Sequence, residues 1–180
     1  MEDKSHKPKL IIITGRPGSG KSTLSHIIAR KIRCPLISRD EIKEGYINTV
    51  KTEHKNVTNE SNIIIFNTFF NIIENLLDNK ITVIAEAAFQ HKNWIQNYKK
   101  LKEKSIIKVI ICKINFELAY KRYLDRKQED PLRVYFHGDP VIPVEDSEYE
   151  YIKIPEPTLE VDTSDKYIPN INAIKLFIYN

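Results

Sequence analysis

The stretch that decides the fold is Gly15-Arg16-Pro17-Gly18-Ser19-Gly20-Lys21-Ser22-Thr23, which matches the pattern G-x-x-x-x-G-K-[ST] at every defined position. Three of the five glycines in the chain fall within these nine residues. The apolar run 9–14 precedes them, and four apolar residues follow at helical spacing: Leu24, Ile27, Ile28 and Ile32. A buried strand, a glycine-rich turn and an amphipathic helix are therefore predicted in that order.

Such a turn between a strand and a helix is typical of a loop that binds a polyphosphate. Small residues let successive backbone N–H groups approach the phosphates, and the helix adds the positive end of its dipole. We expect the backbone of 15–20 to wrap ATP, Lys21 to bridge the β- and γ-phosphates, Ser22 to ligate Mg²⁺ and Thr23 to reach the α-phosphate. A glycine turn without a ligand is the alternative, and the flanking strand and helix argue against it.

Beyond this loop, short apolar runs alternate with amphipathic stretches along the whole chain. Strands are predicted at 9–14, 35–38, 82–86, 106–114 and 159–161, and helices at 21–32, from 40, at 60–78, 94–101, 116–127 and 171–178. The polar stretch 48–58 is predicted to be a loop. The alternation implies a three-layer α/β domain spanning 1–180 with a mainly parallel, five-stranded sheet. The proline-punctuated segment 127–157 is predicted to be a mobile lid.

Composition excludes several other classes of protein. The 180 residues are 41% hydrophobic and 29% charged, which is ordinary for one folded domain. The apolar stretch 63–73 is too interrupted to span a membrane, and the charged first ten residues do not resemble a signal peptide. Cys34 and Cys112 cannot build a disulfide framework, which favours a cytoplasmic setting. A net charge of +4, without a basic stripe, leaves nucleic acid only as a substrate end.

The chain lacks the marks of other nucleotide-binding proteins. A guanine-reading Asn-Lys-x-Asp is not found, because Asn79-Lys80 continues into Ile81-Thr82. A large ring ATPase needs a much longer chain. A small phosphotransferase remains, which needs a nucleotide and a hydroxyl-bearing acceptor.

Two residues after the second predicted strand are candidates for the acceptor side. Asp40 lies at the carboxyl edge of the sheet, where open α/β folds bind ligands, and a carboxylate there can take the proton of a hydroxyl. The alternative is that Asp40 only caps the following helix. Lys43, one turn on, could bind an anionic acceptor, or it could be an ordinary surface lysine.

Glu86 closes the predicted strand 82–86 and is a candidate for holding a Mg²⁺-bound water or orienting the acceptor. Simple exposure to solvent is the alternative, and the four apolar or small residues before it argue against that. Gln90 and His91 follow and could line the acceptor pocket, although a polar loop explains them equally well.

Arginine is scarce in this chain, with 21 of the 28 basic residues being lysine, yet three arginines lie close together. Arg122 and Arg126 are four apart on one predicted helix, and Arg133 follows in the proline-containing segment. Arginine forks stabilise the charge that spreads over a phosphoryl group during transfer. The alternative is a solvated face with salt bridges to Glu117, Asp125 or Asp130.

With these features combined, the chain resembles the small P-loop kinases of the polynucleotide 5′-kinase, chloramphenicol phosphotransferase and zeta-toxin group. The segment Ser38-Arg39-Asp40-Glu41-Ile42-Lys43 is similar to their catalytic segment, which implies that Asp40 is the general base. Arg122 and Arg126 match their lid arginines, although many polynucleotide kinases carry Arg in place of Lys43. Segments 86–91, 136–139 and 157–163 resemble stand-alone bacterial proteins labelled as AAA-type ATPases, which would place the Asp162-Thr163 turn near the adenine.

Three functions remain open at this point. The main hypothesis is an ATP- and Mg²⁺-dependent kinase that phosphorylates a hydroxyl on a small molecule or a nucleic-acid 5′ end. A second keeps this chemistry but makes the chain a toxin or a resistance factor acting on a nucleotide-sugar or an antibiotic. The third is a non-catalytic nucleotide-binding module that regulates a partner.

Overall fold

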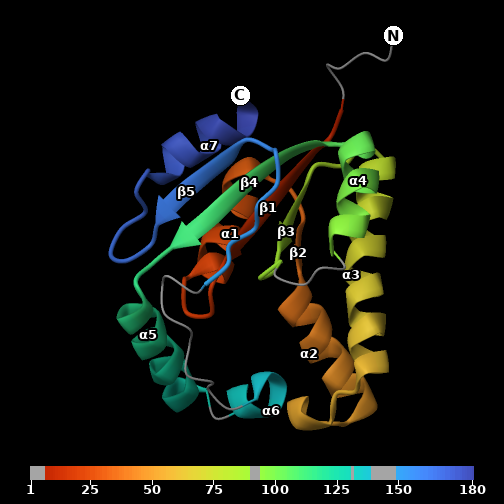
Figure 1. The fold of residues 1–180 in the computed structure, drawn as a ribbon, viewed down its shortest axis with the longest axis vertical. Coiled ribbons are helices and arrows are strands. Elements are labelled where there is room, and N and C mark those ends of the chain that lie inside the picture. Colours follow the sequence, from red (N-terminus) through yellow and green to blue (C-terminus); the bar gives the residue numbers. More distant parts are fainter. Residues whose placement is uncertain (1–6, 90–93, 131, 139–148) are drawn as a thin grey trace.

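The computed structural model describes residues 7–89, 94–130, 132–138 and 149–180, and it contains a five-stranded parallel sheet in the order β2-β3-β1-β4-β5 (Figure 1). The strands are β1 (Lys9–Gly15), β2 (Leu36–Ser38), β3 (Val83–Glu86), β4 (Ile106–Lys113) and β5 (Thr158–Asp162). All four strand pairs are parallel. The predicted α/β class and the parallel sheet of five strands are confirmed.

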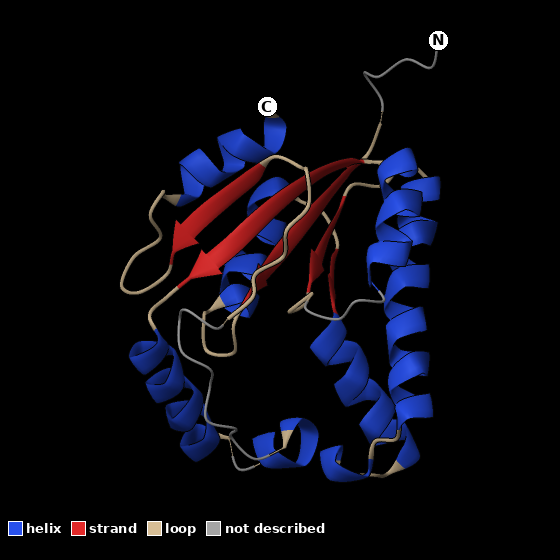
Figure 2. Ribbon diagram, viewed as in Figure 1, coloured by secondary structure: helices blue, strands red, loops and turns tan. Residues whose placement is uncertain are grey.

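Helices cover both faces of the sheet (Figure 2), because consecutive residues of the central strand are apolar and so present apolar side chains to both faces. Ile11 and Ile13 pack on one side with α1 (Lys21–Ile32) and α7 (Ile171–Tyr179). Leu10 and Ile12 pack on the other side with α3 (Asn59–Asp78) and α4 (Trp94–Lys104). The result is three layers with a buried sheet in the middle.

Three further helices lie beyond the carboxyl ends of the strands (Figure 1): α2 (Arg39–Val50), α5 (Phe116–Glu129) and α6 (Arg133–His137). The short 3₁₀ turn η2 (His54–Asn56) contacts α6, which also contacts α2 and α5. These elements surround the carboxyl edge of the sheet, where the predicted site residues are collected.

One prediction of irregular structure was wrong in part. Helix α2 continues to Val50 and η2 follows, both inside the stretch 48–58 that was predicted to be a loop. These elements are short or polar, and tertiary contacts rather than apolar periodicity stabilise such elements. The short helix α6 lies inside the segment 127–157 that was predicted to be a lid.

The described part of the chain includes no helix that combines the length and apolar character needed to cross a bilayer. Both thiols are free, and burial raises the pKa of Cys34 to about 11 and that of Cys112 to about 12. Thiols with pKa values this high stay protonated at neutral pH and are poor nucleophiles.

Candidate active site

The glycine-rich turn between β1 and α1 has a backbone that side chains would disrupt. Gly18 has a φ of 81°, and a Cβ there would collide with the main-chain carbonyl of Ala119 on α5. Gly20 is the N-cap of α1 with a φ of 74°, and no side chain caps that helix. The first-turn amides of α1 are therefore left for an anion, as the phosphate-loop prediction requires.

Main-chain and side-chain hydrogen bonds hold this turn in shape. The Ser19 amide donates to the Arg16 carbonyl at 3.1 Å. The Thr163 hydroxyl, from the loop after β5, donates to the Ser19 carbonyl at 2.7 Å. Pro17, Ser22 and Thr23 are exposed, so the hydroxyls of the last two are accessible to a bound nucleotide.

The predicted residues Lys21 and Glu86 meet at the end of the turn. Strand β3 lies between β1 and β2, so its last residue is flanked by the phosphate loop and by Ser38. The Ser38 hydroxyl donates to Glu86 Oε2 at 2.8 Å, and Lys21 Nζ lies 3.8 Å from Glu86 Oε1. The Glu86 side chain is only 1% exposed, so exposure to solvent does not explain it.

Burial raises the pKa of Glu86, although the Lys21 ammonium and the Ser38 hydroxyl oppose this shift. Among the described residues, Glu86 Oε1 accepts no hydrogen bond. The buried Glu86 carboxylate beside Lys21 and the exposed hydroxyl of Ser22, the next residue of the loop, are oxygen ligands of the kind that Mg²⁺ prefers, directly or through water. Ser22 and Glu86 therefore fit the predicted metal.

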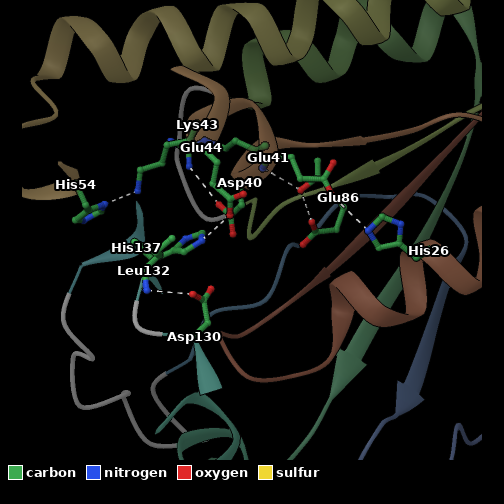
Figure 3. A network of polar contacts seen from close by, with 12 residues as sticks. His26, Asp40, Glu41, Lys43, Glu44, His54, Glu86, Asp130, Leu132 and His137 are labelled. Carbon is green, nitrogen blue, oxygen red and sulfur yellow. Dashed lines mark hydrogen bonds and ion pairs between the residues drawn. The ribbon is translucent and has the colours of Figure 1, made fainter. Parts of the chain in front are cut away.

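Asp40 lies on the first turn of α2 and is half-exposed, with its carboxylate 4.0 Å from Arg39 Nη1. The alternative capping role is wrong, because Ser38 is the N-cap and accepts from the Glu41 amide. The carboxylate is close enough to Glu86 to help raise the pKa of that residue, and it also acts on Lys43 and His54 (Figure 3). Asp40 is thus an accessible carboxylate beside the end of the phosphate loop.

Lys43 is not an ordinary surface lysine. It is 7% exposed, and its ammonium donates to Nδ1 of His54 (Figure 3). Burial lowers the pKa of Lys43, and burial together with the Lys43 charge lowers the pKa of His54. His54 also hydrogen-bonds the main chain of Phe136 on α6, while Glu44 accepts from His137 at 2.7 Å. Helix α6 is therefore fastened both to α2 and to η2.

The three predicted arginines lie on α5 and α6 close enough to repel one another. Burial and the charges of Arg133 and Arg122 lower the pKa of Arg126. Within the described residues none of the three forms an ion pair, so the salt-bridge alternative finds no support there. Arg133 Nε is buried without a hydrogen bond among these residues, and its guanidinium lies 5.5 Å from the centroid of the Tyr123 ring. Glu129 is the carboxylate that acts on Arg126, and it does not offset the lowered pKa, so grouped cations with so little compensation are suited to an anion.

Arg122 differs from Arg126 and Arg133 because its guanidinium donates hydrogen bonds to main-chain carbonyls. Its Nη1 donates to the Thr163 carbonyl at 2.9 Å, and its Nη2 donates to the Ser164 carbonyl. The same Nη1 would lie 3.9 Å from a Cβ built on Gly20. Arg122 thus joins α5 to the loop after β5 directly beside the phosphate loop.

The sequence prediction missed several residues that organise this site. Ser38 carried a signal, since Ser38-x-x-Glu41 is a capping pattern, but its bond to Glu86 requires the sheet order. His54 and His137 carried none, because only the fold brings them to α2. The predicted acceptor residue Gln90 and its neighbour His91 lie outside the described residues.

The fold and this arrangement define the class as an α/β protein of the P-loop kinase type. Two solved structures of high coverage share it. A protein classed as a kinase from Chloroflexus aurantiacus J-10-fl superposes with a TM-score of 0.83 at 24% identity, covering 96% of this chain and 97% of the other. The APS kinase CysC of Mycobacterium tuberculosis, solved with AMPPNP and APS, gives 0.62 at 14% identity, covering 97% and 99%.

More particularly, the chain belongs to the zeta toxin family, whose model matches residues 1–175. The PezAT toxin–antitoxin system of Streptococcus pneumoniae includes a similar chain, with a TM-score of 0.54 at 17% identity over 73% of this chain and 56% of that one. Comparison with curated protein sequences gives no match. The family and the kinase folds together support a phosphotransferase with a nucleotide-binding loop.

Proposed function

We propose that this protein is an ATP- and Mg²⁺-dependent kinase that transfers the γ-phosphoryl group to a hydroxyl acceptor. The observation that carries the proposal is the buried Glu86 carboxylate paired with Lys21 at the end of the glycine turn, with the accessible Asp40 carboxylate beside it. A lysine for the phosphates, a carboxylate for the metal and a carboxylate for the acceptor proton are the groups that phosphoryl transfer requires.

In this proposal the acceptor hydroxyl lies between Asp40 and the terminal phosphate. Its oxygen bonds to the γ-phosphorus while the bond from that phosphorus to the bridging oxygen breaks and ADP leaves. Asp40 takes the hydroxyl proton as general base. Lys21 and Arg126 offset the charge on the transferred group, and Arg122 orders the loop beside the nucleotide. Ser22 and Glu86 would hold Mg²⁺, which would supply further charge neutralisation.

The acceptor side is assigned to the α2 and α6 elements. Segment 127–157 acts as the lid, since α6 already contacts α2 and η2. Arg133 and Lys43 bring positive charge to this side, and Gln90, which lies outside the described residues, is assigned to the acceptor from the sequence alone. An acceptor that carries an anionic group near its hydroxyl fits these residues best.

The test is the variant Asp40→Asn, with Glu41→Gln as the matched control. Glu41 is the neighbouring carboxylate, but it pairs with His26 at 3.3 Å and has no role in the proposal. The protein is incubated with γ-labelled ATP and fractionated cell extract, and ATP affinity is measured separately by calorimetry. We expect Asp40→Asn to keep ATP affinity within about twofold and to lose about 10²–10⁴-fold in transfer. Undiminished transfer in this variant would remove Asp40 from the mechanism.

Membership of the zeta toxin family favours one particular version of this proposal, in which the acceptor is a nucleotide-sugar or an antibiotic. Expression of the intact chain and of Lys21→Met in a bacterial host distinguishes it. A growth or drug phenotype that depends on Lys21 supports this version. Equal growth and equal drug sensitivity of both strains argue against it. If the protein binds ATP but transfers phosphate to nothing in a broad hydroxyl panel, a regulatory nucleotide-binding module becomes the better explanation.

A further inference from the structure

Arg16 belongs to the phosphate loop by sequence, but its side chain enters the interior. It is 0% exposed and is among the largest fully buried side chains of the described chain. A buried guanidinium requires compensation for the hydration that it loses. Its Cζ lies 4.9 Å from the centroid of the Tyr149 ring, within the range of a cation–π interaction.

Tyr149 begins the strap, which is the described segment 149–157 that crosses the α3–α4 side of the sheet (Figure 1). The far end of the strap is anchored: Glu156 accepts from Tyr98 and Lys102, and the Val109 amide of β4 donates to the Pro157 carbonyl at 2.9 Å. The strap therefore presents Tyr149 to the phosphate loop from a fixed base.

The ring of Tyr149, rather than its hydroxyl, makes the contact that the structure shows. Tyr149 is 9% exposed, and its buried hydroxyl forms no hydrogen bond with any described residue. Burial raises the pKa of Tyr149, so the phenol stays neutral and offers its π face to the cation. Tyr151 packs edge-on against this ring at 4.7 Å and supports its orientation.

Arg16 also shapes the turn directly through its main chain. Its carbonyl accepts the Ser19 amide at 3.1 Å, which closes the turn, and the Ser19 carbonyl is held in turn by Thr163. A shift of Arg16 therefore moves the backbone whose amides are expected to bind the phosphates. Binding a polyphosphate in this way depends on amides that already converge.

We propose that Tyr149 is a positioning residue for nucleotide binding, acting through Arg16 to hold the start of the phosphate loop. The proposal rests on the nucleotide-binding part of the proposed function and is independent of the acceptor. It assigns a role to a residue that lies 133 positions away from Arg16 in sequence. Neither residue touches the phosphates through its side chain in this proposal.

Calorimetric titration of the 180-residue chain with Mg-ATP tests the proposal, using Tyr149→Phe, Tyr149→Trp and Tyr149→Leu. The control is Ile154→Ala, which removes apolar packing from the same strap without touching the aromatic pair. We expect Phe and Trp to keep Kd within about threefold, because both retain a π face, and Leu to raise Kd about tenfold. Ile154→Ala should lower the thermal midpoint and leave Kd unchanged.

A second variant, Arg16→Lys, keeps the charge but lacks the planar group, and it should also raise Kd while Tyr149→Phe does not. The proposal is overturned if folded Tyr149→Leu binds Mg-ATP as tightly as the wild type. It is also overturned if Phe weakens binding as much as Leu, or if Ile154→Ala does so equally. Failure of the wild-type chain itself to bind Mg-ATP would instead refute the proposed function, and this inference with it.

Discussion

Replacing Glu86 by Gln keeps the shape of a buried side chain at the centre of the site and removes its charge. Glu86 is 1% exposed, accepts from Ser38 at 2.8 Å and lies 3.8 Å from the Lys21 ammonium. Gln can still accept the Ser38 hydrogen bond through its carbonyl oxygen. The variant therefore measures the difference between two free energies: the cost of desolvating a buried carboxylate and the gain from its attraction to the Lys21 ammonium.

Two unit charges 3.8 Å apart attract by about 4 kcal/mol at an effective dielectric constant of about 20. The pKa of Glu86 is nevertheless raised: burial is the largest cause, and the charges of Asp40 and Glu41 act in the same direction, so desolvation and this repulsion together exceed the attraction and the hydrogen bond. Lys21 is only partly buried and can turn to water when its partner is neutral. We therefore expect Glu86→Gln to stabilise the nucleotide-free protein by about 1–2 kcal/mol. For a chain of this size each kcal/mol raises the thermal midpoint by about 2–4 °C.

The pH dependence follows from the direction of the shift. Because the folded protein holds the Glu86 proton more tightly than the unfolded chain, the carboxyl group stabilises the fold below its ordinary pKa of 4.5. That contribution is lost as the pH rises through the raised folded value. The midpoint of Glu86→Gln minus that of the wild type should therefore grow as the pH rises above the ordinary pKa of 4.5.

Thermal unfolding followed by circular dichroism, without nucleotide, measures this difference. Lys21→Met is the opposing variant: it keeps the buried carboxylate and removes the cation, so its stability should fall most at pH 8. Glu86→Gln should also lose Mg²⁺-dependent transfer despite its higher stability. A Glu86→Gln protein that is less stable than the wild type at pH 8, or a midpoint difference that does not change with pH, would refute the reasoning.

Three further perturbations have defined outcomes. Gly18→Ala places a methyl group against the Ala119 carbonyl at a positive φ, so calorimetry should show Mg-ATP affinity falling at least about tenfold and the fold weakening by about 1–2 kcal/mol. The control Gly45→Ala, where a Cβ meets nothing within 4 Å in helix α2, should instead stabilise by about 0.5–1 kcal/mol. Arg126→Gln removes one of three mutually repelling cations, so the ligand-free midpoint should rise while the transfer rate falls; a fall in both would contradict the charge argument. Because the folded pKa of His54 is lowered, its contribution to stability is lost on acidification below about pH 6.5, and His54→Gln should flatten that loss in thermal scans.

Much of this architecture could be predicted from local patterns. The glycine spacing predicted the phosphate turn because positive φ values and close backbone packing, as at Gly18, restrict the residue type at those positions. Continuous apolar runs predicted the central strands because both faces of a parallel sheet are covered. The 20-residue helix α3 was predicted within one residue at its start, since its apolar face recurs at three and four positions.

The surroundings of the individual side chains could not be predicted in this way. Lys43 looked like a surface lysine, and only the packing of η2 and α6 against α2 buries it and pairs it with His54. Asp40 could have been a cap, but Ser38 holds that position and leaves the Asp40 carboxylate accessible. Such outcomes depend on which distant segments meet, and hydrophobic periodicity carries no information about that.

The sequence by itself therefore determined that a strand, a glycine turn and a helix form an anion-binding loop within a parallel α/β sheet. These features depend on backbone conformation and on the spacing of apolar residues, and both are determined by residues that are close together in the sequence. Only the tertiary structure decided that Arg16 lies beneath Tyr149, that Glu86 is buried between Lys21 and Ser38, and that Arg122 is bound to the loop after β5. The charge, solvation and reach of an ionisable group are set by neighbours from distant parts of the chain, and those neighbours exist only once the sheet has assembled.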